Sequence, residues 1–224
     1  MSKHLNREVE KLKKMLLALS AIVEESVHRA VVSIERRDEK LARKVIDTDI
    51  EIDHIEVDVE EECLKILALH QPVAIDLRFV ISLLKINSDL ERIGDHAVNI
   101  AEHAVFLASQ PRVDIPFDMT AMAEKSKAML KMSLDSLVNL DSALDRKVIL
   151  ADDEVDAMNR EMYSRVEEAI RRSPEKIEIL IHFLNVSRHL ERLADHATNI
   201  AEDVIYMIDG EIIRHKTEEY LQKR

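Results

Sequence analysis

At 224 residues the chain is long enough for one large domain or two of ordinary size, and either would bury a sizeable apolar core. Its formal net charge of -12 at pH 7 and its pI near 5.3 argue against nucleic-acid binding, because no basic field attracts the phosphate backbone. With only two Gly and four Pro, the chain has few turn formers, which favours long helices over sheets.

The composition also predicts a cytoplasmic protein without membrane insertion. The first residues are charged throughout, without the apolar stretch of a signal peptide, and no run of about 18 apolar residues occurs anywhere. The single cysteine, Cys63, cannot form an intrachain disulfide and is interpreted as a small buried residue.

Apolar residues at steps of three and four predict three long helices in the first half of the chain. Asp38 is a suitable N-cap for the second of them, and Pro72 stops it. The expected boundaries are Arg36 for the end of the first helix, Ala74 or Asp76 for the start of the third, and Ala108 for its end.

The second half predicts three more helices, over residues 119–140, 141–172 and 174–208, with Gly210 as a C-cap and a frayed helical tail from Glu211. Pro111 and Pro116 mark a short connection between the halves. We therefore expect two domains, residues 1–112 and 113–224, each a three-helix unit.

A duplicated segment relates the two units. LERIGDHAVNIAE begins at Leu90 and recurs one hundred positions later as LERLADHATNIAE, with ten of thirteen positions identical. Core packing does not require the same polar residues twice, so a polar surface is duplicated with the helices. The sequence predicts an all-α fold of two tandem three-helix bundles, with six long antiparallel helices related by an internal repeat.

Four of the expected helices each carry two acidic residues at a spacing of i, i+4, which places both carboxylates on one helix face. Like charges at this spacing destabilise a helix, and a bound cation is the simplest compensation. Neighbouring helices would bring about four carboxylates together, a ligand set suited to Mg²⁺, Mn²⁺, Ca²⁺ or oxidised iron. The expected metal ligands are Asp49, Asp53, Glu91, Asp95, Asp152, Asp156, Glu191 and Asp195.

The alternative is a solvated acidic face whose carboxylates pair with nearby bases such as Arg92 and Arg192. On the third expected helix the acids point away from the apolar stripe, and therefore outward from the bundle. Asn99 and Glu102, with their counterparts Asn199 and Glu202, extend the same polar strip. His96 and His196 are either outer ligands or surface histidines.

A ferritin-like metal-oxo enzyme is the alternative function, because Glu25 with His28 and Glu51 with His54 have the Glu-x-x-His spacing of diiron bundles. Neither pair has a counterpart in the second unit, and both lie among charged positions. A Gly-rich phosphate loop, a GxSxG elbow and a Cys-His constellation are all missing from the sequence. We therefore do not expect an enzyme.

The four acidic motifs DIEID, ERIGD, DDEVD and ERLAD, together with HATNIAE, resemble the signature of the PhoU family of phosphate-uptake regulators. The resemblance implies two three-helix repeats whose eight acidic residues line two surface sites for metal, one site per repeat. Multinuclear iron is the expected cluster, and Zn, Mg, Mn or Ca are the alternatives. It also implies a cytoplasmic, homodimeric adaptor between a phosphate ABC transporter and a sensor histidine kinase. Such an adaptor represses phosphate uptake and the phosphate regulon.

Overall fold

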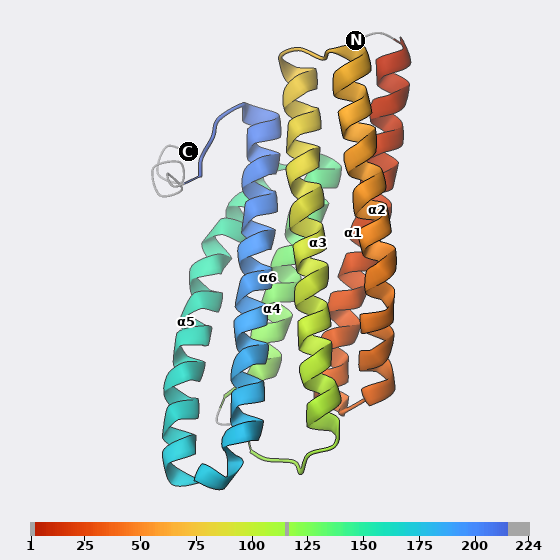
Figure 1. Cartoon of the computed structure of the whole chain (residues 1–224). Coiled ribbons are helices and arrows are strands. Elements are labelled where there is room, and N and C mark those ends of the chain that lie inside the picture. The colour runs from red at the N-terminus through yellow and green to blue at the C-terminus, as the bar shows by residue number, and fades with distance from the viewer. Residues whose placement is uncertain (1–2, 115–116, 215–224) are drawn as a thin grey trace.

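The computed structural model describes residues 3–114 and 117–214, and this part of the chain is built from long helices that lie side by side (Figure 1). The helices are α1 (Lys3–Arg36), α2 (Glu39–His70), α3 (Ile75–Ala108), α4 (Met119–Asn139), α5 (Ser142–Arg172) and α6 (Ile177–Asp209), with a short 3₁₀ turn η1 (Pro174–Lys176) before α6. The all-α prediction is confirmed. None of the described helices is both long and apolar enough to cross a membrane.

Local capping chemistry explains why the helix ends fall where the sequence predicts them. The carboxylate of Asp38 accepts a hydrogen bond from the backbone N–H of Leu41 at 3.0 Å and so caps α2. Gly210 ends α6 with a φ of 76°, a left-handed conformation that costs glycine little.

One predicted boundary is wrong by a turn. The sixth α-helix begins at Ile177, not at Pro174, because Pro174–Lys176 form a 3₁₀ turn in which the Lys176 N–H donates to the Ser173 carbonyl at 3.0 Å. The expected helical tail is also not helical over residues 211–214, and its remaining residues lie outside the described part of the chain.

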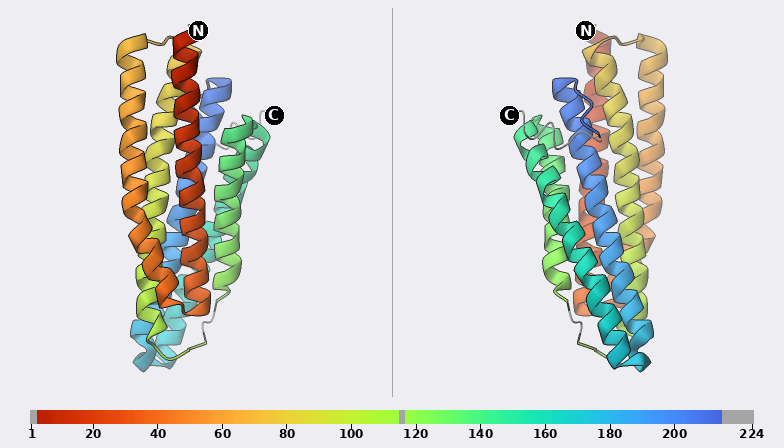
Figure 2. Two further views of the ribbon diagram at one scale, coloured as in Figure 1. Left: turned by 90° about the vertical axis from the view of Figure 1, so that its right-hand side faces the viewer. Right: turned by 90° about the vertical axis from the view of Figure 1, so that its left-hand side faces the viewer.

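α1, α2 and α3 pack together, as do α4, α5 and α6, and α3 lies along α6 between the two groups (Figures 1 and 2). The repeated helices α3 and α6 therefore form most of the contact between the repeats, and α1 and α4 add a smaller one. The division into domains of residues 1–112 and 113–224 stays a prediction.

The repeated helices α3 and α6 bury their apolar stripes in the core. Ile86, Leu90 and Ile93 of α3 are fully buried, and the equivalent stripe of α6 is buried as well. Burial of each such side chain contributes roughly 1.5–3 kcal/mol, so these stripes fix the rotation of both helices. Cys63 is buried, as predicted.

Candidate metal sites

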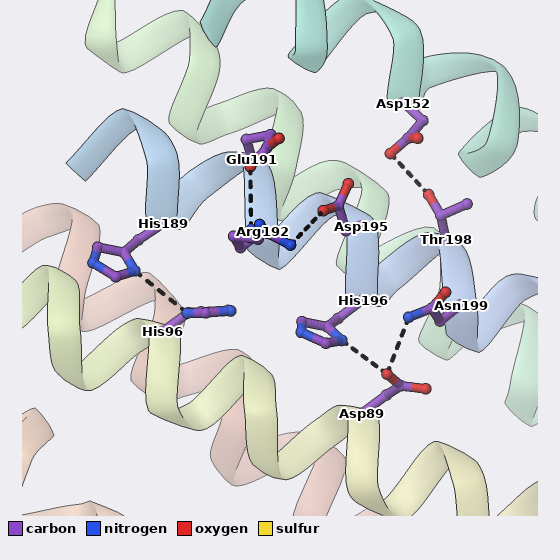
Figure 3. A network of polar contacts seen from close by, with 10 residues as sticks. All are labelled: Asp89, His96, Asp152, His189, Glu191, Arg192, Asp195, His196, Thr198 and Asn199. Carbon is purple, nitrogen blue, oxygen red and sulfur yellow. Dashed lines mark hydrogen bonds and ion pairs between the residues drawn. The ribbon is translucent and has the colours of Figure 1, made fainter. Parts of the chain in front are cut away.

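The second repeat brings three of its four predicted acidic ligands close together. Carboxylate oxygens of Asp156 on α5 and of Glu191 and Asp195 on α6 all lie within 4.8 Å of one another. Figure 3 shows Glu191 and Asp195 on the same side of α6, which follows from their i, i+4 spacing. The fourth predicted ligand, Asp152 on α5, accepts a hydrogen bond from Thr198 at 3.1 Å.

The pKa values of two acids of this site are raised, which favours their protonated forms. The pKa of Asp195 is raised from 3.8 to about 6, chiefly by burial and then by the charges of Glu191 and Asp152. Burial also raises the pKa of Glu191, although Arg192 opposes this. A bound cation would relieve both the desolvation and the mutual repulsion, so the donor set fits a metal ion with oxygen ligands.

The ion pairs between arginines and the acids of this site are long. Arg192 lies 3.8 Å from both Glu191 and Asp195, at the outer limit of an ion pair, and its side chain is half exposed. Arg160 lies 3.3 Å from Asp156 within α5. The predicted bridging role of Arg192 is therefore present, but contacts of this length and exposure stabilise weakly.

The first repeat places its four predicted acids on α2 and α3, where they interact electrostatically. Burial raises the pKa of Asp49 to about 6, and the charges of Asp53 and Asp95 add to this. The pKa values of Glu91 and Asp95 are raised by burial and by neighbouring carboxylates, while Arg92 lowers them. Among the described residues, these four do not form a cluster as tight as that of the second repeat.

Gly94 lets α2 approach α3 beside the acids of the first repeat. A Cβ at this position would lie 3.2 Å from Cδ1 and 3.3 Å from Cγ2 of Ile52, and 3.8 Å from Oδ1 of Asp49. The second repeat has Ala194 at the equivalent position. The first site thus lies beside a close contact between α2 and α3 that an added side-chain atom would disturb.

Sequence reasoning missed a fifth acid in the first site. Glu56 on α2 raises the pKa of Glu91, and its Oε1 accepts a hydrogen bond from the amide of Asn87 at 3.1 Å. The second repeat has Asn159 and Ser187 at these positions, joined by a hydrogen bond of 2.9 Å. The available signal was that Glu56 follows Asp49 by seven residues, which returns to the same helix face.

The two amides of the repeated motif make different hydrogen bonds in the two repeats. Asn99 donates to the backbone carbonyl of Asp95 at 2.7 Å, and Asn199 donates to Asp89 at 3.3 Å. Glu102 is exposed on α3, and Glu202 lies 3.9 Å from Arg214. The extension of the acidic strip by these residues stays a prediction.

His96 and His196 are partly buried, and their hydrogen-bond partners are not the acids of the two predicted metal sites. Both lie at the contact between α3 and α6, where His196 donates to Asp89 and His96 faces His189 (Figure 3). By contrast, the residues of the two Glu-x-x-His pairs are all exposed. They are Glu25, His28, Glu51 and His54. A ferritin-like centre needs such residues inside the bundle.

Comparison with known proteins agrees with this architecture. Residues 16–104 and 119–204 each match the sequence profile of the PhoU domain. The chain belongs to the PhoU family. The two matched segments also confirm the tandem repeat that the duplicated motif predicts.

PhoU proteins of several bacteria are similar along nearly their whole length. The phosphate-specific transport system accessory protein PhoU homolog of Aquifex aeolicus is 38% identical over 210 residues, covering 94% of this chain and 95% of that protein. The homolog of Clostridium acetobutylicum is 35% identical, with 91% and 93% covered. The crystal structure of PhoU from Pseudomonas aeruginosa superposes with a TM-score of 0.89 at 34% identity, covering 92% of this chain and 99% of that one.

Proposed function

We propose that this protein is a non-enzymatic regulator of phosphate transport, a cytoplasmic adaptor that contacts a phosphate ABC transporter and a sensor histidine kinase and represses uptake and the phosphate regulon. Relatives named as accessory proteins of phosphate-specific transport systems support the transport role. The observation that carries the proposal is the pair of partly buried acidic sites, one per repeat, whose carboxylates have raised pKa values. They suit cation binding and docking, and they lack a nucleophile–base arrangement.

A surface of α2 supports the docking role. Residues 47–61 contain eight acidic residues and neither Lys nor Arg. Within and just beyond this segment Ile50, Val57 and Leu64 follow one another at seven-residue spacing and are 64%, 51% and 51% exposed. An apolar line flanked by acids suits a basic amphipathic partner segment, because apolar contact and charge complementarity then act together.

The second repeat does not repeat this surface. Residues 150–164 of α5 contain five acidic residues and one Arg, and the positions equivalent to Ile50, Val57 and Leu64 are Asp153, Arg160 and Glu167. Arg160 and Glu167 each form an ion pair within α5. The outer face of α2, defined by the three exposed apolar residues, is therefore the surface that we assign to the protein partner.

The acidic sites are proposed to bind metal through Asp49, Asp53, Glu91 and Asp95 in the first repeat and through their four counterparts in the second, with multinuclear iron as the expected cluster and Zn²⁺, Mg²⁺, Mn²⁺ or Ca²⁺ as alternatives. A bound cation would cancel charge beside the acidic surface of α2 and so couple metal loading to docking. A homodimer is part of the proposal.

Elemental analysis of the purified protein tests the metal sites. We expect Glu91→Gln/Asp95→Asn and Glu191→Gln/Asp195→Asn each to lose about half of the metal bound by the unaltered protein, because each repeat supplies one site. Glu25→Gln/Glu51→Gln is the matched control, since it removes two exposed acids outside the sites. Equal metal content in all proteins would refute the assignment, and ferroxidase turnover that depends on Glu25 and Glu51 would favour the ferritin-like alternative.

Capture of the phosphate transporter from detergent-solubilised membranes tests the docking role. We expect Ile50→Gln/Val57→Gln/Leu64→Gln to reduce capture at least tenfold, whereas Leu150→Gln, at an exposed position of α5, leaves it unchanged. In cells, deletion of the protein should switch on phosphate-starvation genes in rich phosphate. Genes that stay silent after deletion would contradict the regulatory role.

A further inference from the structure

The contact between α3 and α6 contains a row of five histidines at seven-residue spacing. His96 and His103 lie on α3, and His182, His189 and His196 lie on α6. They pair across the contact, with Nδ1 atoms 3.4 Å apart for His96 and His189 and 2.9 Å apart for His103 and His182. Residue numbers rise along one helix as they fall along the other, so the antiparallel packing creates the pairs.

Asp89 holds one end of this row. Its Oδ1 accepts a hydrogen bond from Nδ1 of His196 at 2.8 Å. The ring of His196 in turn faces the ring of His96, and the ring centroids are 5.5 Å apart (Figure 3). Nδ1 of His96 lies on the other side of its ring and faces His189 (Figure 3).

The distance between His96 and His189 differs from that of an ordinary hydrogen bond. Hydrogen bonds from nitrogen are about 2.7–3.2 Å long, a range that includes the His103–His182 pair but not the 3.4 Å pair. Two imidazole nitrogens bound to one tetrahedral metal ion at about 2.0–2.1 Å are about 3.4 Å apart. The separation of His96 and His189 therefore matches two ligands of one ion.

We propose that His96 and His189 bind one divalent transition-metal ion, of the class that prefers imidazole (Zn²⁺, Co²⁺, Ni²⁺ or Cu²⁺), through their Nδ1 atoms. Water completes the coordination. This site is separate from the carboxylate sites in both position and chemistry, since oxygen clusters suit harder ions. It also stands independently of the proposed regulatory function.

A further observation supports the site. The hydrogen bond between His196 and Asp89 holds the histidine that lies beside His96, much as outer carboxylates hold the imidazoles around a metal ion.

Arg92 and Arg192 also lie near His96 and lower its pKa, so their positive charge opposes a bound cation. Arg192 is partly neutralised by Glu191 and Asp195. Because His96 and His189 belong to different repeats, the ion would join α3 to α6 and stabilise their contact.

Titration of the metal-free protein with Co²⁺ tests the proposal, because tetrahedral Co²⁺ with nitrogen ligands absorbs strongly in the visible range. We expect one equivalent to produce these bands, Zn²⁺ to displace it, and Zn²⁺ to raise the midpoint of thermal unfolding. His96→Gln/His189→Gln should lose the Co²⁺ bands and with them the displacement by Zn²⁺, while its circular dichroism without metal matches that of the unaltered protein. His28→Gln/His54→Gln, which removes two exposed histidines, is the matched control and should keep all three effects.

Two more variants separate this site from its surroundings. Asp89→Asn removes the charge that orients His196 and should weaken Zn²⁺ binding about 10–100-fold, whereas a purely structural Asp89 would leave the affinity unchanged. Glu191→Gln/Asp195→Asn removes the nearest carboxylate site and should keep the Co²⁺ bands. Absence of the bands in the unaltered protein, their survival in His96→Gln/His189→Gln, or their loss in Glu191→Gln/Asp195→Asn would each overturn the proposal.

Discussion

Thr198 on α6 donates a hydrogen bond from its hydroxyl to Oδ1 of Asp152 on α5 at 3.1 Å, and the equivalent residue of α3 is Val98, which has no side-chain donor. The hydroxyl stabilises the ionised form of Asp152 and lowers its pKa against the raising effect of burial. In the first repeat, the pKa of Asp49 is raised by burial and by neighbouring acids. The hydroxyl of Thr198 therefore acts on Asp152 in a way that Val98 cannot act in the first repeat.

Exchange of this hydroxyl between the repeats should change the two pKa values in opposite directions. In Val98→Thr we expect the pKa of Asp49 to fall from about 6 toward 3.8, and in Thr198→Val we expect that of Asp152 to rise. Carboxyl resonances followed by NMR during a pH titration measure both. Thr48→Val is the control, because the Thr48 hydroxyl donates to the Lys44 carbonyl. Unchanged titration of Asp49 in Val98→Thr would show that position 98 does not reach it.

The acidic sites should make the metal-free protein less stable as pH rises. The folded-state pKa values of Asp49 and Asp195 are about 6, above the ordinary 3.8, so the folded state binds more protons between pH 3.8 and 6 and its free energy of unfolding falls across this range. We expect Asp49→Asn and Asp195→Asn to stabilise the protein by about 1 kcal/mol each at pH 7.5, a value discounted for partial solvation, and to have little effect at pH 4.

Urea unfolding at pH 4 and 7.5 measures the stability of each protein. When the metal that the sites bind is added at pH 7.5, the unaltered protein should become more stable than Asp49→Asn and Asp195→Asn. Equal effects of Asp49→Asn at pH 4 and 7.5 would contradict the linkage.

Asp145 should destabilise the protein at alkaline pH for a different reason. It is fully buried near the start of α5, and burial raises its pKa to about 7, although Ser136 lowers it. The first repeat has the buried residue Ala42 at the equivalent position. Because ionisation of Asp145 becomes costly as pH passes from 3.8 through about 7, Asp145→Ala should stabilise the protein by about 2 kcal/mol more at pH 8.5 than at pH 5.

Thermal or urea unfolding at pH 5 and 8.5 gives this difference. Asp141→Ala, which removes an exposed acid and the N-cap of α5, is the control and should destabilise by about 1 kcal/mol at pH 5. The loss should be smaller at pH 8.5, because the charge of Asp141 also raises the pKa of Asp145. A stabilisation by Asp145→Ala that does not vary with pH would show that the pKa of Asp145 is the same in the folded and unfolded states.

Gly94→Ala should destabilise the first repeat even though alanine favours helices. The helical gain is about 1 kcal/mol, but the added Cβ would lie 3.2 Å from Ile52 Cδ1, and overpacking of this kind costs about 1–3 kcal/mol. We expect a net loss of about 1 kcal/mol in urea unfolding, and a smaller loss in an Ile52→Val background, which lacks Cδ1. The converse change, Ala194→Gly, should cost about 1 kcal/mol. A gain of stability in Gly94→Ala would show that Ile52 moves freely.

The sequence alone determined the features that depend on one helix at a time. Apolar periodicity, caps such as Asp38 and Gly210, and the prolines set the six helices nearly to their observed ends, because these signals act within a few residues. The i, i+4 spacing likewise placed Glu191 and Asp195 on one face. The duplicated motif gave the tandem repeat, since two copies of one polar pattern need two copies of the helix that carries it.

Only the tertiary structure decided which faces of the helices contact one another. A helical wheel contains no information on how far one helix is rotated or shifted against another, so it did not predict that Asp156 joins Glu191 and Asp195 more closely than Asp152 does. For the same reason it assigned His96 and His196 to an outer surface. The antiparallel packing of α3 on α6 places them in the contact between the repeats, because burial of both apolar stripes fixes the rotation of the two helices together.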